Sequence, residues 1–226
     1  GMVRAAEPPK LALKPVAVLR DTGLRHAHDV THIEPLSDGR RALSTSRDGS
    51  IRLWDLTTGE ELKRYVPAEG DDVWNGKLLP GEREFVSCGD DNHATRWNLE
   101  TGAVVAQYKL PSTGMRLAVV PGGKQFVACD SGRLATLWDI ETATRTVAYK
   151  GHKESVYSAA VSPDGKICVT CSEDGTVRGW NTATGEKLWV IEKVEPEEEA
   201  GAADPFGGGG GADPFGFAEP PAEEKR

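Results

Sequence analysis

The sequence lacks long hydrophobic runs, has few cysteines and aromatic residues, and carries no excess of positive charge. No apolar run approaches the roughly 20 residues that a transmembrane helix needs, so no membrane span is predicted. Lys and Arg total 27 against 35 Asp and Glu, which gives the 226-residue chain a net charge of −8. General binding of nucleic acid or of an anionic membrane needs a positive field, and we therefore expect neither partner.

The sequence also lacks a recognisable secretion signal. No positively charged segment followed by an apolar one stands at its start. A cytoplasmic location is therefore expected, although the Gly1-Met2 opening leaves room for an upstream signal that has been removed.

The negative charge is concentrated at one end of the chain. Residues 192–226 contain ten acidic residues against three basic ones, which leaves residues 1–191 close to neutral at −1. The same end holds five prolines, the five-glycine run Gly207–Gly211 and few bulky apolar side chains. Such a segment buries too little apolar surface to offset its ordering entropy, so we predict a disordered acidic tail there. Residues 1–15 are predicted to be a flexible lead-in.

Residues 16–191 contain a fourfold repeat. Tryptophan followed by Asp or Asn recurs with spacings of 43, 41 and 42 residues, at Trp54-Asp55, Trp97-Asn98, Trp138-Asp139 and Trp180-Asn181. Turn sequences rich in Gly, Pro and Asp recur 15 to 18 residues before each tryptophan, and a Thr-Gly or Thr-Ala turn recurs after it. The segments between are short, β-branched and without helical periodicity. Each repeat is therefore predicted to form four antiparallel strands in an all-β fold.

These repeats resemble those of the WD40 family of β-propellers. The fourth repeat carries nearly the whole pattern, with Gly151-His152, Ser162-Pro163-Asp164-Gly165, Ser172-Glu173-Asp174-Gly175 and Trp180-Asn181. The resemblance implies four four-stranded antiparallel blades, approximately over residues 20–64, 65–108, 109–149 and 150–191. It also implies a hydrogen-bonded tetrad of a loop His, a strand Ser or Thr, a turn Asp and the Trp indole.

The implied structural tetrads map fully onto two of the four repeats. They are His26, Ser44, Asp48 and Trp54 in the first repeat, and His152, Thr170, Asp174 and Trp180 in the fourth. The second repeat has Ser87, Asp91 and Trp97 but Glu69 at the His position, and the third has only Trp138, with Leu110, Ala128 and Gly132 elsewhere. A buried indole N–H and hydroxyl need partners, so the second and third blades are expected to depend more on apolar packing.

Four blades are fewer than the seven or so with which WD40 proteins close a ring, so the resemblance favours an arc with two uncovered blade faces. We favour a homodimer in which two chains pair as four plus four blades. The alternatives are that the chain is the C-terminal part of a larger propeller, or that four blades close alone. Residues 15–20 indicate an additional outer strand, which a missing blade or a bridge between two chains would use.

Two patterns suggest metal or redox chemistry. Cys168 and Cys171 form a Cys-x-x-Cys, which is typical of zinc or redox sites. Residues three apart in a strand point to opposite faces, however, and Cys88, Cys129 and Cys171 share one repeat position, nine residues before each tryptophan. We therefore predict buried packing without a disulfide, which is consistent with a reducing compartment.

The second pattern is a histidine cluster, formed by His26, His28 and His32, but no second group of ligands accompanies it. Ser, His and Asp occur together only at tetrad positions, where the indole engages the hydroxyl. No nucleophile elbow, phosphate loop or acid–base pair is recognised. The sequence therefore predicts no metal site, no cofactor, no catalytic residue and no enzyme activity.

In WD40-like propellers, partners bind the narrow top face, formed by the loops entering each blade's first strand and by the turns between its second and third strands. The candidate residues are Thr31, Trp74, Met115 and Tyr157 beside the central channel, with Asp29, Asp72, Arg47, Asp90 and Glu173 around them. Aromatic residues and Met are enriched at interface hot spots, although Trp74 and Tyr157 serving only as a channel plug is an equally good interpretation. The acidic residues near the second blade suit a basic partner peptide.

The tail contains a short duplicated motif. Asp204-Pro205-Phe206 recurs as Asp213-Pro214-Phe215 and resembles the motif by which endocytic proteins dock onto clathrin-adaptor appendage domains. Duplication within a Gly- and Pro-rich tail is the simpler explanation. The sequence as a whole predicts a non-catalytic scaffold with protein or peptide partners, and the rival hypothesis is an accessory module of an enzyme or of a metal or redox system.

Overall fold

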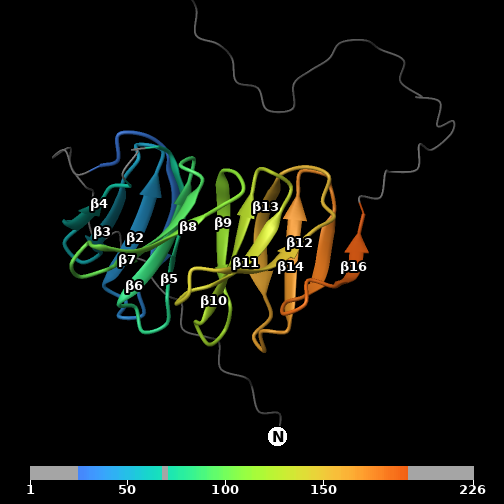
Figure 1. Ribbon diagram of the computed structural model, residues 1–226. Coiled ribbons are helices and arrows are strands. Elements are labelled where there is room, and N and C mark those ends of the chain that lie inside the picture. The colour runs from blue at the N-terminus through green and yellow to red at the C-terminus, as the bar shows by residue number, and fades with distance from the viewer. Residues whose placement is uncertain (1–24, 68–70, 193–226) are drawn as a thin grey trace, which may run out of the picture. The chain divides into compact units, whose positions relative to one another are not determined.

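The computed structural model describes residues 25–67 and 71–192, which form sixteen strands and no helix. The strands make four sheets, which we call blades 1 to 4 in chain order (Figure 1). Blade 1 contains β1 (Val30–Pro35), β2 (Arg41–Ser46), β3 (Ile51–Asp55) and β4 (Glu61–Tyr65). Blade 2 contains β5 (Val73–Leu78), β6 (Glu84–Gly89), β7 (His93–Asn98) and β8 (Val104–Lys109). Blade 3 contains β9 (Gly114–Val119), β10 (Gln125–Asp130), β11 (Ala135–Asp139) and β12 (Arg145–Tyr149). Blade 4 contains β13 (Val156–Val161), β14 (Ile167–Ser172), β15 (Val177–Asn181) and β16 (Lys187–Ile191).

Within each blade, neighbouring strands are antiparallel and follow the order of the sequence. The prediction of an all-β fold with four four-stranded blades is confirmed. Glycine supports the tight turns where the backbone needs a positive φ, as at Gly39 (67°) and Gly165 (73°) between the first and second strands. None of the described residues forms a helix of the length and hydropathy that a membrane crossing needs.

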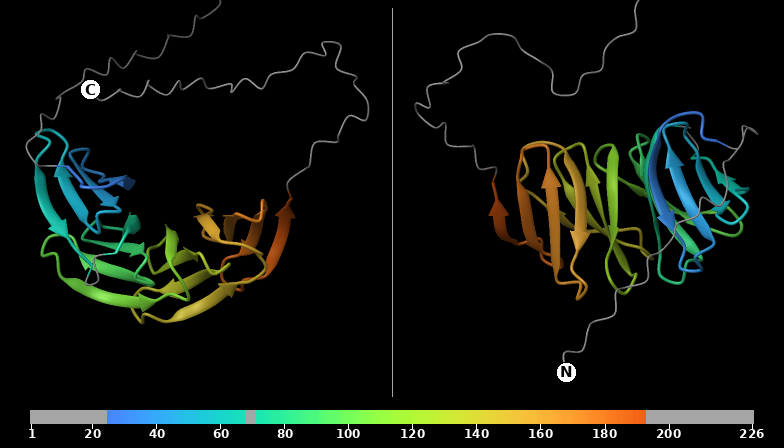
Figure 2. Two further views of the ribbon diagram at one scale, coloured as in Figure 1. Left: turned by 90° about the horizontal axis from the view of Figure 1, so that it is seen from above. Right: turned by 180° about the vertical axis from the view of Figure 1, so that it is seen from behind.

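The four blades follow one another along an open arc (Figure 2). The first strands of successive blades, β1, β5, β9 and β13, contact one another in turn and lie on its inner side. Blades 1 and 4 are the two ends, and in the described part of the chain each has a neighbour on one side only. The predicted additional strand at residues 15–20, the lead-in and the acidic tail lie outside the described residues.

The hydrophobic core is divided into three parts, one at each joint between neighbouring blades. The first part packs Leu43, Ile51, Leu53 and Tyr65 of blade 1 against Val73, Phe85, Trp97 and Leu99 of blade 2. The second and third parts repeat the arrangement between blades 2 and 3 and between blades 3 and 4. Burial of apolar surface in a blade therefore depends on the presence of the next blade.

A buried tyrosine also crosses each joint. The hydroxyl groups of Tyr65, Tyr108 and Tyr149 donate hydrogen bonds of 2.6, 2.8 and 2.7 Å to backbone carbonyl oxygens of the following blade. The acceptors are the carbonyl oxygens of Leu99, Ile140 and Thr182. Burial raises the pKa of all three tyrosines, so each hydroxyl keeps its proton and remains a donor.

The tyrosine bond makes a measurable contribution to stability. Tyr149→Phe removes the hydroxyl and leaves the carbonyl of Thr182 without that donor inside the joint. We expect a loss of about 1–2 kcal/mol in the free energy of unfolding, measured by urea denaturation. Tyr157→Phe is the matched control, because Tyr157 is 44% exposed and crosses no joint, and it should change the value by less than about 0.5 kcal/mol. Equal losses in the two variants would contradict this role.

Candidate functional site

The first predicted tetrad comes together in blade 1. The indole nitrogen of Trp54 donates to Ser44 Oγ at 2.7 Å, and that oxygen lies 2.6 Å from His26 Nε2. His26 Nδ1 lies 3.0 Å from a carboxylate oxygen of Asp48. Since the indole can only donate, the network is satisfied when Ser44 donates to Nε2 and Nδ1–H donates to Asp48. Such an arrangement requires a neutral imidazole.

Blade 4 repeats this network with threonine in place of serine. Trp180 donates to Thr170 Oγ1 at 2.9 Å, and Thr170 Oγ1 lies 2.7 Å from His152 Nε2. His152 Nδ1 lies 3.0 Å from Asp174. The tetrad joins a loop, two strands and a turn of one blade, so it stabilises the blade internally rather than across a joint.

In both networks the histidine is held neutral and the aspartate is held ionised. Burial lowers the pKa of His26 and His152 and outweighs the opposing effect of the neighbouring carboxylates. Burial acts in the opposite sense on Asp48 and Asp174, but hydrogen bonds from hydroxyl and backbone groups hold the pKa of both carboxyls well below their usual range. Neutral imidazole next to ionised carboxylate is therefore the native state of each tetrad.

A serine, a histidine and an aspartate in hydrogen-bonded sequence also describe a hydrolase triad. In blade 1, however, Ser44 is only 5% exposed, and its oxygen already accepts a hydrogen bond from the indole N–H of Trp54. A substrate carbonyl has no route to this hydroxyl. The arrangement is suited to holding a turn against a strand and not to nucleophilic attack.

Sequence reasoning missed an arginine attached to each full tetrad. Arg52 is 4% exposed and pairs with Asp48 at 3.2 Å and with Glu61 at 2.9 Å. Arg178, two residues before Trp180, lies 3.7 Å from Asp174. Both arginines stand two residues before the signature tryptophan, where blades 2 and 3 have Thr95 and Thr136. That spacing was the available signal.

The indoles of blades 2 and 3 also find partners. Trp97 donates to Ser87 at 2.8 Å, as the retained serine indicated. Trp138 donates to Thr136 Oγ1 at 2.9 Å, a residue of its own strand that the alignment of tetrad positions overlooked. Blade 3 therefore satisfies its indole without the His, Ser and Asp positions. Glu69, at the His position of blade 2, lies outside the described residues.

Asp130 replaces the missing turn carboxylate of blade 3. It is 1% exposed, and its Oδ1 accepts hydrogen bonds from the backbone N–H groups of Gly132 and Leu134. Its Oδ2 has no hydrogen-bond partner among the described residues. Burial raises the pKa of this carboxyl.

The four cysteines are free thiols. Cys88, Cys129 and Cys168 are buried, and burial raises the pKa of all three thiols, that of Cys168 to about 12. Cys171 is only partly buried, so the expectation of a small buried position does not hold for it. The reason is its place in blade 4, since within residues 25–67 and 71–192 no further blade covers that face of the sheet.

The histidine cluster does not converge. His26 binds Asp48, His28 accepts from the backbone of Asp29, and His32 lies 3.2 Å from Glu34. Within residues 25–67 and 71–192, no group of three or more His, Cys, Asp or Glu side chains is arranged to hold a metal ion.

The four predicted channel-side residues share a backbone feature that the sequence did not reveal. Between the first and second strands of each blade the register shifts by one residue. The residue left without a partner in each shift is Thr31, Trp74, Met115 or Tyr157. A β-bulge re-aims the side chain of its extra residue, so these four residues occupy equivalent bulge positions, one in each blade.

Five of the predicted top-face residues contact one another where blades 1 and 2 meet. The guanidinium of Arg47 stands 5.5 Å from the ring centre of Trp74 and binds Asp72 at 2.7 Å. It also approaches Asp29 at 3.7 Å. The indole nitrogen of Trp74 donates to Asp90 at 2.7 Å. We call these five residues the Trp74 cluster; its ring is fixed on one side by a cation and at its nitrogen by a carboxylate.

The remaining candidates lie outside this cluster. Thr31 is oriented inward, because its hydroxyl donates to the carbonyl of Val73 at 2.6 Å across the joint. Met115 is partly buried, and its carbonyl accepts from Arg116 at 3.0 Å. Tyr157 is 44% exposed, and desolvation together with the nearby Glu173 carboxylate raises its pKa.

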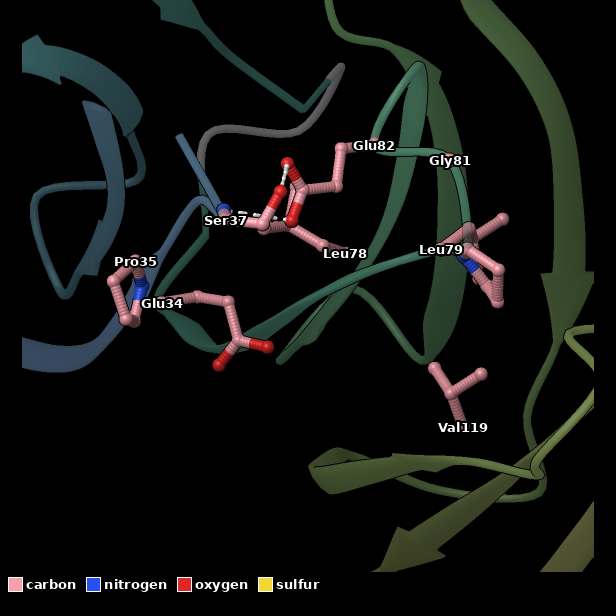
Figure 3. A pocket seen from close by; sticks show the side chains of 9 residues that line it. Glu34, Pro35, Ser37, Leu78, Leu79, Gly81, Glu82 and Val119 are labelled. Atoms are coloured by element: carbon pink, nitrogen blue, oxygen red, sulfur yellow. Dashed lines mark hydrogen bonds between the residues drawn. The ribbon is translucent and has the colours of Figure 1, made fainter. Parts of the chain in front are cut away.

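A pocket of about 480 Å³ lies at the turns between the first and second strands of blades 1 and 2, at the opposite end of the blades from the predicted top face (Figure 3). Its walls include Glu34, Leu78, Glu82 and Val119. Both carboxylates are already engaged. Glu34 pairs with Lys77 at 2.7 Å, and Glu82 accepts from the backbone and hydroxyl of Ser37 at 2.8 and 2.9 Å. Both carboxylates therefore link blade 1 to blade 2.

Four successive antiparallel sheets joined face to face are the blades of a β-propeller. The family description "WD domain, G-beta repeat" matches residues 14–55 and 143–181. The chain therefore contains WD40 repeats in these two regions, as the resemblance of its first and fourth repeats implied.

Curated relatives share the repeat region. Apoptotic protease-activating factor 1 of Rattus norvegicus is 27% identical over 178 residues, or 78% of this chain and 14% of that protein. Serine-threonine kinase receptor-associated protein of Gallus gallus is 29% identical over 163 residues, or 72% of this chain and 45% of that protein. Target of rapamycin complex subunit wat1 of Schizosaccharomyces pombe is 24% identical over 166 residues, or 70% and 52%.

The match thus spans about half or less of the length of each of these relatives. WD40 repeats are in general protein-interaction modules, and the repeats themselves are generally non-catalytic.

The tetrads predict a pH dependence of stability. The folded pKa of His26 and His152 lies below the ordinary histidine value of 6.5, so the unfolded chain binds more protons in the interval between the two values. The free energy of unfolding should therefore be highest above about pH 6.5 and fall as the pH drops through that interval. His152→Gln should reduce this fall and lower stability at pH 7 by about 1–2 kcal/mol. Urea titrations at several pH values measure both effects.

The matched control is His28→Gln, because the His28 side chain is 52% exposed and belongs to no tetrad. This variant should reproduce the wild-type profile. An unchanged profile in His152→Gln would show that the tetrad is not the source of the pH dependence.

Proposed function

We propose that this chain is a non-catalytic scaffold that binds a protein or peptide partner through the Trp74 cluster at its top face. The observation that carries the proposal is the presentation of Trp74 on a β-bulge, with its ring held between Arg47 and Asp90. A large aromatic ring that is already oriented loses little side-chain entropy on binding. Val73, the residue before Trp74 in β5, is by contrast buried in the joint between blades 1 and 2.

The charge around Trp74 favours a basic partner. Asp29, Asp72 and Asp90 lie within the cluster, and only Arg47 balances them there. The Asp29 side chain is 72% exposed, and its contacts with His28 at 3.5 Å and Arg47 at 3.7 Å are long. We therefore propose a partner segment with Lys or Arg beside an apolar group that contacts the indole. The four free thiols fit a reducing compartment, and a cytoplasmic location is part of the proposal.

Within the described residues, the open arc leaves two end blades uncovered, and a second copy of this chain is a partner that would cover them. A second copy of this chain would add four blades to the four present, and an eight-bladed ring is within the range of known propellers. We propose such a homodimer as the scaffold's working form. Multi-angle light scattering over a concentration series tests it: about twice 24.3 kDa supports the pair, and a strictly monomeric species contradicts it.

The Trp74 proposal is tested by partner capture in cells followed by titration of the identified partner. Trp74→Ala should weaken binding by about 30-fold or more, since hot-spot tryptophans contribute about 2 kcal/mol or more. Thermal unfolding of the same variant must stay within a few degrees of wild type. Loss of the fold would instead favour a structural plug.

Val105→Ala is the matched control, because Val105 is 45% exposed on β8 and lies away from the top-face residues. It should bind the partner as wild type does. Asp90→Asn adds a test of charge. If the partner is basic, the variant should bind it more weakly than wild type, and the difference in affinity should be larger at low salt than at high salt. An unchanged affinity contradicts a basic partner.

A further inference from the structure

Blade 1 exposes apolar positions that are buried in the other blades. Leu56 is 52% exposed, whereas Leu99, Ile140 and Thr182 at the same repeat position are 1%, 2% and 3% exposed. Val30 is 50% exposed, against 2% for Val73 and 0% for Val156. Ile33 is 62% exposed, against 3% for Leu117. In blades 2 to 4, the side chains at these positions pack against the preceding blade.

The signature tryptophan of blade 1 shows the same difference. Trp97, Trp138 and Trp180 are 3%, 6% and 1% exposed, but Trp54 is only partly buried. Val30, Ile33, Trp54 and Leu56 together form what we call the blade-1 end face. It is the receiving half of a blade joint.

Blade 4 exposes the opposite half. Ile191 is 61% exposed, whereas Tyr65, Tyr108 and Tyr149 at its repeat position are at most 2% exposed. Val177 is partly buried, although its equivalents Ile51, Ala94 and Ala135 are completely covered. The blade-4 end face consists of Val169, Cys171, Val177, Trp189 and Ile191.

Two substitutions distinguish this end face from the three internal joints. The joint tyrosine is replaced by Ile191, which has no hydroxyl to donate. Gly179 stands where blades 1 to 3 have Leu53, Arg96 and Leu137. The ring of Trp189 occupies the freed space, since a Cβ on Gly179 would overlap it. Trp189 nevertheless remains 38% exposed, so it presents an apolar ring at the face.

We propose that the blade-4 end face of one copy docks on the blade-1 end face of a second copy, head to tail and twice per pair. The proposal rests on the proposed homodimer and assigns its contact residues. The residues of each end face occupy the repeat positions that contact the neighbouring blade at the internal joints. The two end faces are therefore complementary in the same way as two internal blades. Ile191 would meet Leu56, the position whose backbone accepts the tyrosine hydroxyl at internal joints.

A second copy satisfies both ends at once. After one head-to-tail contact between two arcs, one blade-1 end face and one blade-4 end face remain uncovered. Closure on the second contact covers all four faces and leaves no free end, as a twofold ring requires. A contact between like end faces would instead bring two receiving or two presenting faces together, without the pairing of repeat positions found at every internal joint.

Two single variants of the full chain test the assignment. Ile191→Asp and Leu56→Lys each place a charge on one end face, at residues that are 61% and 52% exposed in the single chain. Each should raise the dissociation constant of the pair by about 100-fold or more, measured by sedimentation velocity. Val105→Asp, at a valine of an internal blade that is 45% exposed, should leave the constant unchanged.

Mixing the two variants identifies the head-to-tail arrangement. The mixed pair has one wild-type joint and one joint in which the introduced carboxylate opposes the introduced ammonium group in place of the two apolar side chains. An equimolar mixture should therefore recover most of the dimer. If only one variant weakens the pair, like faces meet and the proposal is wrong.

Three further outcomes separate this proposal from the homodimer on which it rests. A wild-type dimer insensitive to both variants would overturn the joint while leaving self-association intact. A monomeric wild type would overturn the homodimer itself. Species larger than a dimer would overturn closure at two copies.

Discussion

The burial of each blade against its neighbour is the interaction on which the rest of this structure depends. A single four-stranded blade has two faces and too few residues to bury either by itself. Every large apolar side chain of the core therefore lies in one of three joints, and none of these joints belongs to one blade alone. The tyrosine bonds across the joints add direction to this packing, since each runs from a fourth strand to the following blade.

The two kinds of polar network are distributed unevenly along the arc. Blades 1 and 4, which have one neighbour each in the part of the chain that the structure describes, contain the full tetrads with their arginines. Blades 2 and 3, which have two neighbours, satisfy their indoles with a single hydroxyl. An end blade receives less stabilisation from packing, and an internal network of hydrogen bonds and ion pairs compensates within the blade. The top face benefits as well, because Asp48 and Asp174 fix turns that border it.

The fold and much of the tetrad geometry were accessible from the sequence, because a constant repeat places equivalent residues in equivalent environments. The four antiparallel strands expected in each repeat are the four strands of each observed sheet. The tetrad positions could be aligned for the same reason. Thr136 and Asp130 escaped that alignment, since each takes over a role from a shifted position.

Other features depend on geometry that a repeat pattern does not contain. The bulge at Trp74 is a register shift, and the stacking of Arg47 on its ring joins residues of two blades. The partial exposure of Cys171 was also unexpected, because the burial of a repeat position depends on the neighbour present and not on the residue. Sequence periodicity assigns a position to a joint, whereas only the structure shows whether that joint is filled.

The division of the core into separate joints has a consequence for the way the molecule opens. In a row of units stabilised by nearest-neighbour contacts, the unit with one contact detaches at a lower free-energy cost than a unit with two. Local opening should then begin at the ends of the row and reach the joint between blades 2 and 3 last. Backbone amide protons of β7 and β10 would exchange most slowly with solvent, and those of β1 and β16 most rapidly. Ring closure would erase this gradient, because a ring has no first or last member.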